Sequence, residues 1–223
     1  MLVRGFPAAA FGTNCWVVAP AAGEQCVVID PGIGVEDQLD EVLREHRLQP
    51  VAVLLTHGHL DHTFSVTPVC DAKGIPAWIH PDDRELLADP MKGLSPESRT
   101  MFGGKLEWTE PSDVKLLGTD PLELAGLTFA TDFAPGHTPG SVVFESNDTL
   151  FAGDVLFAGS IGRTDLPGGS WEQMQESLAR VILSRADDIV VHTGHGPSTT
   201  IGTERASNPF LQDLAQAPPS RGL

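Results

Sequence analysis

A compact cluster of histidine and aspartate has the composition and spacing of a metal site. His57, His59, Asp61 and His62 fall within six consecutive positions, although the chain has only 8 histidines in 223 residues. Residues two apart in an extended segment point the same way, so His57 and His59 can bind one ion. Asp61 and His62 then project toward a neighbouring position, where a second ion can bind.

Three later segments each place one potential ligand beside a glycine, at the end of an apolar run. They are Gly136-His137, Gly153-Asp154 and Gly194-His195. Glycine next to a ligand lets the backbone turn sharply and bring the side chain into a crowded site. Imidazole and carboxylate suit Zn²⁺ and also iron or manganese, and the lack of nearby cysteine argues against a structural zinc finger. The sequence therefore predicts two ligand sets for divalent cations, with zinc the best match.

The elements that must position these ligands follow from apolar periodicity. Helical spacing covers 35–46, 66–70 and 170–182, and Ser170 with Gln173 forms a capping box at the start of the last helix. Strand character is found at 17–18, 26–29, 51–55, 75–79, 114–117, 122–133, 141–144, 149–152 and 188–192. Strands with helices, then a meander of strands, then strands with helices again, predict two packed sheets with helices outside.

Other parts of the chain carry weaker patterns. Residues 80–83 indicate a helix start, with Pro81 near the first helical position. Proline and glycine recur over 90–112, which predicts an irregular surface loop or a flap. Residues 215–223 are expected to be a loosely ordered tail. No linker is visible, so we expect a single hydrolase domain over 1–223.

Taken together, these motifs resemble the metallo-β-lactamase superfamily, and more narrowly its glyoxalase II-like (hydroxyacylglutathione hydrolase-like) subgroup in a short single-domain form. Segments 56–62, 151–157, 162–165 and 196–202 carry the resemblance with the ligand motifs. It implies an α/β fold, a four-layer αββα sandwich. It also implies a ligand assignment, in which one metal is held by His57, His59 and His137, the other by Asp61, His62 and His195, and both by Asp154.

The resemblance also implies a reaction. Two divalent ions acidify a shared water and polarise a carbonyl, so a bridging hydroxide is expected to attack a small thioester such as an S-2-hydroxyacyl thiol. Asp61, which orients the water, and Asp154, which bridges the metals, are then the catalytic side chains.

Four further residues near these motifs have two interpretations each. Phe157, Ile161 and Arg163 closely follow Asp154 and either line the substrate pocket or pack within their loop. Asp30, at a strand end, either fixes a ligand imidazole or caps a turn.

One departure from the subgroup leaves the substrate open. Full-length glyoxalase II enzymes append a helical domain that holds glutathione, whereas this chain ends soon after His195 and contains no tyrosine. We therefore expect a small thioester or ester substrate without specifying the thiol carrier. The alternatives are a mononuclear-iron persulfide dioxygenase, a lactonase or β-lactam hydrolase, and a non-catalytic metal-binding protein.

Charge and cysteine usage restrict the partners. The net charge is −16, with 14 basic against 30 acidic residues, so a nucleic-acid partner is not expected. No apolar run approaches the ~20 residues of a membrane span. Cys15, Cys26 and Cys70 are far apart, which is typical of a reducing compartment. These features predict a cytoplasmic protein that acts on small molecules.

Overall fold

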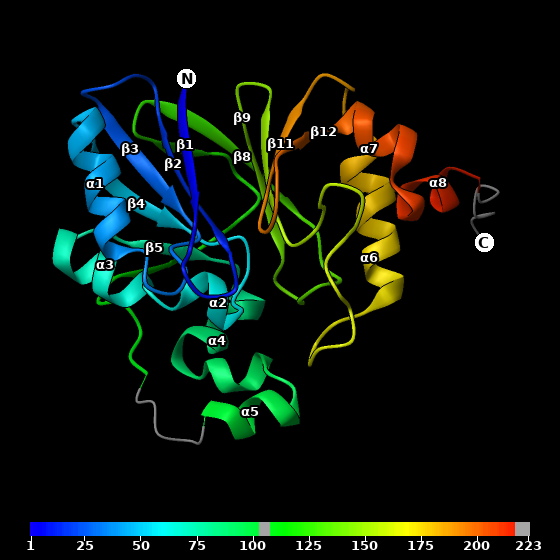
Figure 1. Cartoon of the computed structure of the whole chain (residues 1–223), viewed down its shortest axis with the longest axis horizontal. Helices are drawn as coiled ribbons and strands as arrows, with labels where there is room; N and C mark the ends of the chain where they lie inside the picture. The colour runs from blue at the N-terminus through cyan, green and yellow to red at the C-terminus, as the bar shows by residue number, and fades with distance from the viewer. Residues whose placement is uncertain (103–107, 217–223) are drawn as a thin grey trace.

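Two six-stranded sheets pack face to face and carry helices on both outer sides, as Figure 1 shows. The structure is a computed structural model that describes residues 1–102 and 108–216. Its four layers are helices, sheet, sheet and helices. The predicted αββα sandwich of the metallo-β-lactamase fold is therefore confirmed.

The first sheet is built from the N-terminal half of the chain. The first strand pairs with the second, and the second with the third, in antiparallel orientation. From the third strand to the sixth, neighbouring strands pair in parallel. In sheet order they are β1 (Leu2–Pro7), β2 (Asn14–Ala19), β3 (Gln25–Ile29), β4 (Gln49–Leu54), β5 (Ala77–Ile79) and β6 (Val114–Leu116). Helices α1 (Glu36–His46) and α3 (Val66–Lys73) cover its outer face.

The second sheet is built from the C-terminal half. Only β10 and β11 pair in parallel, while the other pairs are antiparallel. Its strands are β7 (Leu122–Leu124), β8 (Leu127–Phe133), β9 (Val142–Ser146), β10 (Thr149–Gly153), β11 (Val190–Thr193) and β12 (Thr199–Thr200). Its outer face is covered by α6 (Trp171–Ser177), the helical turn Leu178–Ile182, α7 (Ile201–Ser207) and α8 (Pro209–Gln216).

Burial on both faces explains why the central strands are continuous apolar runs. Along β3, Val27 and Ile29 pack between the two sheets, whereas Cys26 and Val28 pack toward the helices. Side chains of a strand alternate between faces, so a strand covered on both sides needs apolar residues at successive positions. All three cysteines are buried and unpaired.

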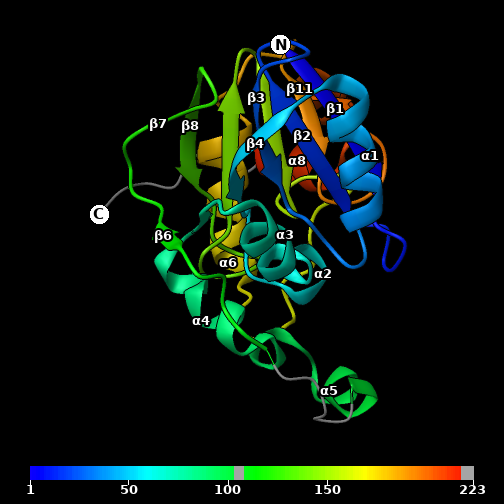
Figure 2. The ribbon, with the colours of Figure 1, turned by 90° about the vertical axis from the view of Figure 1, so that its left-hand side faces the viewer.

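Short helices lie beyond one end of the sheets, next to the predicted metal ligands. They are α2 (Leu60–Thr63), the 3₁₀ turn Pro81–Asp83, α4 (Arg84–Ala88), the 3₁₀ turn Pro90–Gly93 and α5 (Pro96–Phe102). Figures 1 and 2 both place α2, α4 and α5 at this end. Within 1–102 and 108–216, none of the helices has the length and apolar character needed to cross a bilayer.

The predicted irregularity of 90–112 is wrong for much of that segment. Residues 90–93 form a helical turn and α5 covers 96–102, while 103–107 lie outside the described residues. Pro90 and Pro96 begin helices instead of breaking them, because proline is well suited to the first helical position. The Ser95 hydroxyl accepts the amide N–H of Ser98 at 3.2 Å and so caps α5.

Strand predictions were wrong in two further places. The strand expected over 122–133 is a hairpin, because Ala125 and Gly126 both have positive φ and form a two-residue turn. The strand at 188–192 is not the last, since β12 follows it. Residues 215 and 216 end α8, so the predicted tail is helical there, and 217–223 lie outside the described residues.

Candidate metal centre

Four of the predicted ligands stand at the carboxyl ends of strands. His57 follows β4, His137 follows β8, Asp154 follows β10 and His195 follows β11. Strands β8 and β10 are both antiparallel to β9, and β10 is parallel to β11. Therefore β8, β10 and β11 all have their carboxyl ends at the same edge of the sheet. Their ligands therefore lie together.

Six of the seven predicted ligands converge in two groups. In one group, His57, His59 and His137 have ligand atoms within 4.8 Å of one another, and His59 Nδ1 lies 2.8 Å from His137 Nε2. The other group consists of Asp61, His62 and His195. These are the two sets that the resemblance implies.

Asp154 lies between the two groups. Its Oδ1 is 3.2 Å from His62 Nε2, and its Oδ2 is 3.5 Å from His137 Nε2 and 3.7 Å from His195 Nε2. One carboxylate therefore faces histidines of both sets, which is the position of a bridging ligand.

Hydrogen bonds to groups outside the centre decide which ring nitrogen of each histidine is available to bind a metal. His137 Nδ1 donates to the carbonyl of Arg163 at 2.7 Å, so its Nε2 carries a lone pair toward the centre. The single proton of the Thr56 hydroxyl is donated to Asp30 Oδ2 at 2.6 Å. His57 Nδ1, 3.1 Å from that hydroxyl, must then donate to it, which leaves His57 Nε2 unprotonated.

Asp30 also fixes His62. Its Oδ2 lies 2.9 Å from His62 Nδ1, so His62 presents Nε2 to the centre. Of the two interpretations of Asp30, the structure supports contact with a ligand imidazole. Asp30 has positive φ and additionally accepts the amide N–H of Thr56 at 2.8 Å, which ties the strand end to the ligand loop.

The donor set fits divalent cations. Among the described residues, buried His57 Nε2 has no hydrogen-bond partner, and a buried polar atom without a partner is costly. In that same part of the chain, the ion pairs of Asp30, Asp61 and Asp154 involve histidine and neither lysine nor arginine. Buried carboxylates without a permanent cation favour a bound metal.

The pKa values of the imidazoles reflect these surroundings. Burial, with the neighbouring histidines, lowers the pKa of His57 well below its usual value, and burial with His137 lowers that of His59 to about 3. Both rings are therefore neutral near pH 7, the form that binds metal. For His62, burial lowers the pKa, but Asp154 and Asp61 outweigh it and raise the pKa well above its usual value.

Neighbouring atoms leave no room for a Cβ atom at two of the glycines that flank the ligands. A Cβ on Gly194 would lie 2.1 Å from Asp154 Oδ1 and 2.9 Å from His62 Cε1. Gly153 has positive φ, and a Cβ there would lie 2.3 Å from Thr56 Oγ1. Side chains at either position would displace the ligands.

Two residues at the start of β2, Thr13 just before it and Asn14 its first residue, hold the second group, and the sequence did not reveal them. Thr13 donates its hydroxyl to Asp61 Oδ2 at 2.9 Å. The Asn14 amide donates to the carbonyls of Thr193 and Gly196, on either side of His195. Thr13 and Asn14 are both buried. They belong to an ordinary hairpin sequence, so only the fold identifies their role.

A buried aspartate outside the ligand set joins the two loops that carry the first group. Asp83 Oδ2 accepts the amide N–H of Gly58 at 2.8 Å and the hydroxyl of Thr138 at 2.7 Å. Its Oδ1 accepts the amide N–H of Gly140 at 2.7 Å. Gly58 separates His57 from His59, and Thr138 follows His137. The sequence of 80–83 indicated only a helix start, and no sequence signal separates Asp83 from Asp82.

We expect Asp83→Ala to lower both stability and metal affinity. Three donors in the ligand loops lose their acceptor, so the free energy of unfolding should fall by about 3 kcal/mol. Loss of such support typically weakens metal binding by about 10- to 100-fold. Denaturant unfolding and competition with a zinc chelator measure the two effects. Asp82→Ala, whose side chain is 63% exposed, is the matched control, and equal metal affinities in both variants would contradict the role assigned to Asp83.

The metal ligands open into a pocket of about 360 Å³. Asp61 and His195 are the accessible ligands, with side chains 26% and 29% exposed. The three substrate-binding candidates Phe157, Ile161 and Arg163 all line this pocket, together with Ser160 and Leu166. The guanidinium of Arg163 pairs with Asp165 at 2.7 Å.

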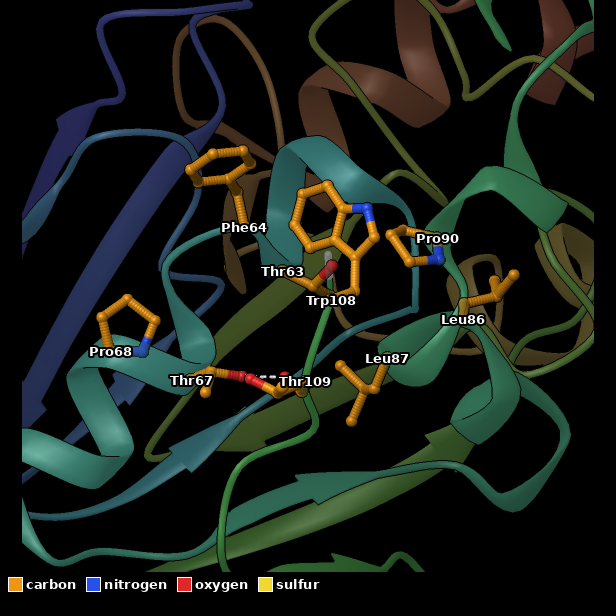
Figure 3. Close-up of a pocket in the computed structure, with 9 residues that line it drawn as sticks. All are labelled: Thr63, Phe64, Thr67, Pro68, Leu86, Leu87, Pro90, Trp108 and Thr109. Carbon is orange, nitrogen blue, oxygen red and sulfur yellow. Dashed lines mark hydrogen bonds between the residues drawn. The ribbon is translucent and has the colours of Figure 1, made fainter. Parts of the chain in front are cut away.

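A second pocket, drawn in Figure 3, lies on the other side of α2 and has a volume of about 240 Å³. Its walls are Thr63, Phe64, Thr67, Pro68, Leu86, Leu87, Pro90, Trp108 and Thr109. None of these nine residues is a predicted ligand, and the hydrogen bond drawn there joins the Thr67 hydroxyl to the Thr109 carbonyl. The predicted ligands therefore open into the other pocket, over the histidines.

Comparisons with known proteins agree with this geometry. A family model described as Metallo-beta-lactamase superfamily matches residues 8–195. The hydroxyacylglutathione hydrolase GloC of Haemophilus influenzae is 35% identical, over 95% of this chain and 98% of its own length.

Two crystal structures are also similar. BLEG-1, described as a B3 metallo-beta-lactamase, has a TM-score of 0.85 and 38% identity, and the match covers 94% of this chain and 99% of BLEG-1. TTHA1623 in a di-iron-bound form has a TM-score of 0.78 and 35% identity, with 93% of this chain and all of TTHA1623 covered.

Proposed function

The chain belongs to the metallo-beta-lactamase superfamily, and from this premise we propose that it is a dinuclear metal-dependent hydrolase of a small thioester. The convergence of seven ligands with an open pocket carries the hydrolase assignment. The similarity to GloC supports a thioester, since that relative is named as a hydroxyacylglutathione hydrolase.

Each metal has its own set of protein ligands in this proposal. His57, His59 and His137 would hold one ion, Asp61, His62 and His195 would hold the other, and Asp154 would contact both. Nitrogen and carboxylate donors suit zinc, and iron and manganese accept the same donors. The di-iron form of TTHA1623 makes iron the second candidate.

The chain's own groups then orient the reaction. Bound divalent ions supply an acidified water and a polarised carbonyl. The Asp61 carboxylate is held by the Thr13 hydroxyl and faces the pocket, so it can accept a hydrogen bond from the attacking water and fix its direction. Phe157 and Ile161 form apolar walls that exclude bulk water from the scissile bond.

The state of the pocket carboxylates favours a thiol leaving group. Burial raises the pKa of Asp61 and of Asp154, but nearby histidines, His62 first among them, outweigh burial and lower both values. Neither carboxyl can therefore donate a proton near pH 7. A thiol, with a pKa of about 8.5, departs as an anion far more readily than an alcohol or an amine.

A substrate panel on metal-loaded protein tests the proposal. We expect S-lactoyl and S-acetyl thiols to release free thiol with kcat/KM more than about 100-fold above that for matched oxygen esters, lactones and nitrocefin. Free thiol is measured with a chromogenic disulfide. Faster turnover of nitrocefin would favour β-lactam hydrolysis, for which the similarity to BLEG-1 is the argument. Oxygen consumption with a persulfide, at one iron per chain, would instead identify a dioxygenase.

A further inference from the structure

An exposed aromatic residue stands at the entrance to the metal centre in a strained conformation. The side chain of Phe11 is 68% exposed, and its backbone has φ of 62°. Positive φ is a true outlier for a bulky residue other than glycine. Such conformations cost about 1–3 kcal/mol and persist where surrounding structure enforces them.

The turn that carries Phe11 is tied to the predicted ligands of the second group. Two residues after Phe11, the Thr13 hydroxyl is bonded to Asp61, and Asn14 holds the loop of His195 through both its side chain and its amide N–H. The position of Phe11 is therefore coupled to the ligands of the second group.

Phe11 forms one wall of a pocket of about 220 Å³ that adjoins the metal pocket. Asp61, Arg163 and Leu166 line both pockets, so the two are continuous. The remaining walls of the smaller pocket are Leu60, Leu94, Ser95 and Ser98. We call this extension the Phe11 subsite.

The chemistry of the Phe11 subsite is that of an apolar binding surface. Its Ser95 and Ser98 hydroxyls lie 3.2 Å apart and bond to each other. Arg163 is the single lysine or arginine among the residues lining the two pockets, and its guanidinium is bonded to both oxygens of Asp165 at 2.7 and 2.8 Å. The described lining of the Phe11 subsite thus offers no unpaired lysine or arginine to an anionic substituent.

We propose that the Phe11 subsite binds an uncharged apolar substituent of the substrate and that Phe11 determines this specificity. The proposal rests on the proposed thioester hydrolysis and specifies the class of thioester. Each methylene that enters the subsite should raise kcat/KM about fourfold, the rate equivalent of burying one CH₂ group. The apolar substituent can belong to the acyl group or to the thiol of the thioester, because the same surface can bind either.

Two thioester series test the proposal and separate the two sides of the bond. One series lengthens the acyl group from acetyl to butyryl and hexanoyl on a single small thiol. The other keeps acetyl and lengthens the thiol from ethanethiol to hexanethiol. In zinc-loaded protein we expect kcat/KM to rise with length in one series, mainly through KM, and to stay nearly flat in the other. The rising series identifies the substituent that binds.

Phe11→Asn removes the aromatic wall while retaining the fold, because asparagine tolerates positive φ. We expect the variant to lose most of the dependence on chain length, and Phe11→Leu to regain part of it. Leu116→Thr changes another exposed apolar residue, 47% exposed on β6, and should keep the wild-type slope. An unchanged slope in Phe11→Asn would refute the subsite, and a flat response of the wild type in both series would do the same.

A binding measurement tests the Phe11 subsite independently of the proposed hydrolysis. Calorimetry compares hexanoate with acetate on the zinc-loaded protein, which requires no turnover. If no thioester is hydrolysed, the proposed function fails, while tighter hexanoate binding that Phe11→Asn abolishes still supports an apolar subsite. Equal binding of the two carboxylates would contradict the subsite whatever the substrate.

Discussion

Replacing His59 with alanine is expected to abolish metal binding at the first site and hydrolysis with it. His59 Nδ1 lies 2.8 Å from His137 Nε2, and the ring is neutral because its pKa is lowered to about 3. Two histidines cannot hold a hydrolytic metal as three do. Since the ligands act as one unit, we expect kcat/KM to fall by more than about 10³-fold.

Metal content per chain by mass spectrometry and thiol release measure the two effects. His46→Ala is the matched control, because His46 lies at the end of α1 and bonds to Arg4, away from the centre. It should retain full metal content and activity. A His59→Ala protein that binds no metal but still hydrolyses the substrate would overturn the assignment of the site.

Removing the metal by chelation is expected to lower activity and stability together. Asp61 and Asp154 remain ionised next to each other in the centre, and among the described residues only histidines pair with them. Two like charges then repel each other where the metal was. A ligand at about 1,000 times its Kd contributes about 4 kcal/mol, so the free energy of unfolding should fall by about that amount.

Reconstitution identifies the native metal. The stripped protein is titrated with zinc, iron(II) or manganese, and both thiol release and the unfolding midpoint are followed. We expect both to recover in parallel and to level off at two ions per chain, with zinc the most effective. Recovery complete at one ion would rule out the dinuclear assignment. Stripped His59→Ala is the control, and it should regain little of either property.

The sequence predicted the ligand loops well because their signals are local. The apolar run at 51–55 and the histidines after it specify a buried strand that ends at a metal site, and the structure has β4 there. That Asp30 fixes a ligand imidazole was one of two interpretations from the sequence, and the structure identifies the imidazole as that of His62. In each case, residue type and a strand end within a few positions carry the information.

The supporting residues could not be predicted because their partners are distant in sequence. Asp83 bonds to Gly58 and Gly140, and Thr13 bonds to Asp61, contacts that exist only once these distant segments come together in the fold. The error at Pro96 has a different cause. Proline is equally compatible with a loop and with the first turn of a helix, so its presence alone could not decide between them.

The centre lies across the seam of the sandwich, with histidines following β4 of one sheet and β8 and β11 of the other. Neither half supplies a complete ligand set. A chain that has been synthesised only to a point before His195 therefore lacks part of the cation site. Loading must follow docking of the halves. Ions bound as proposed would cross-link the two halves, so separating the halves would require breaking coordination bonds as well as apolar contacts.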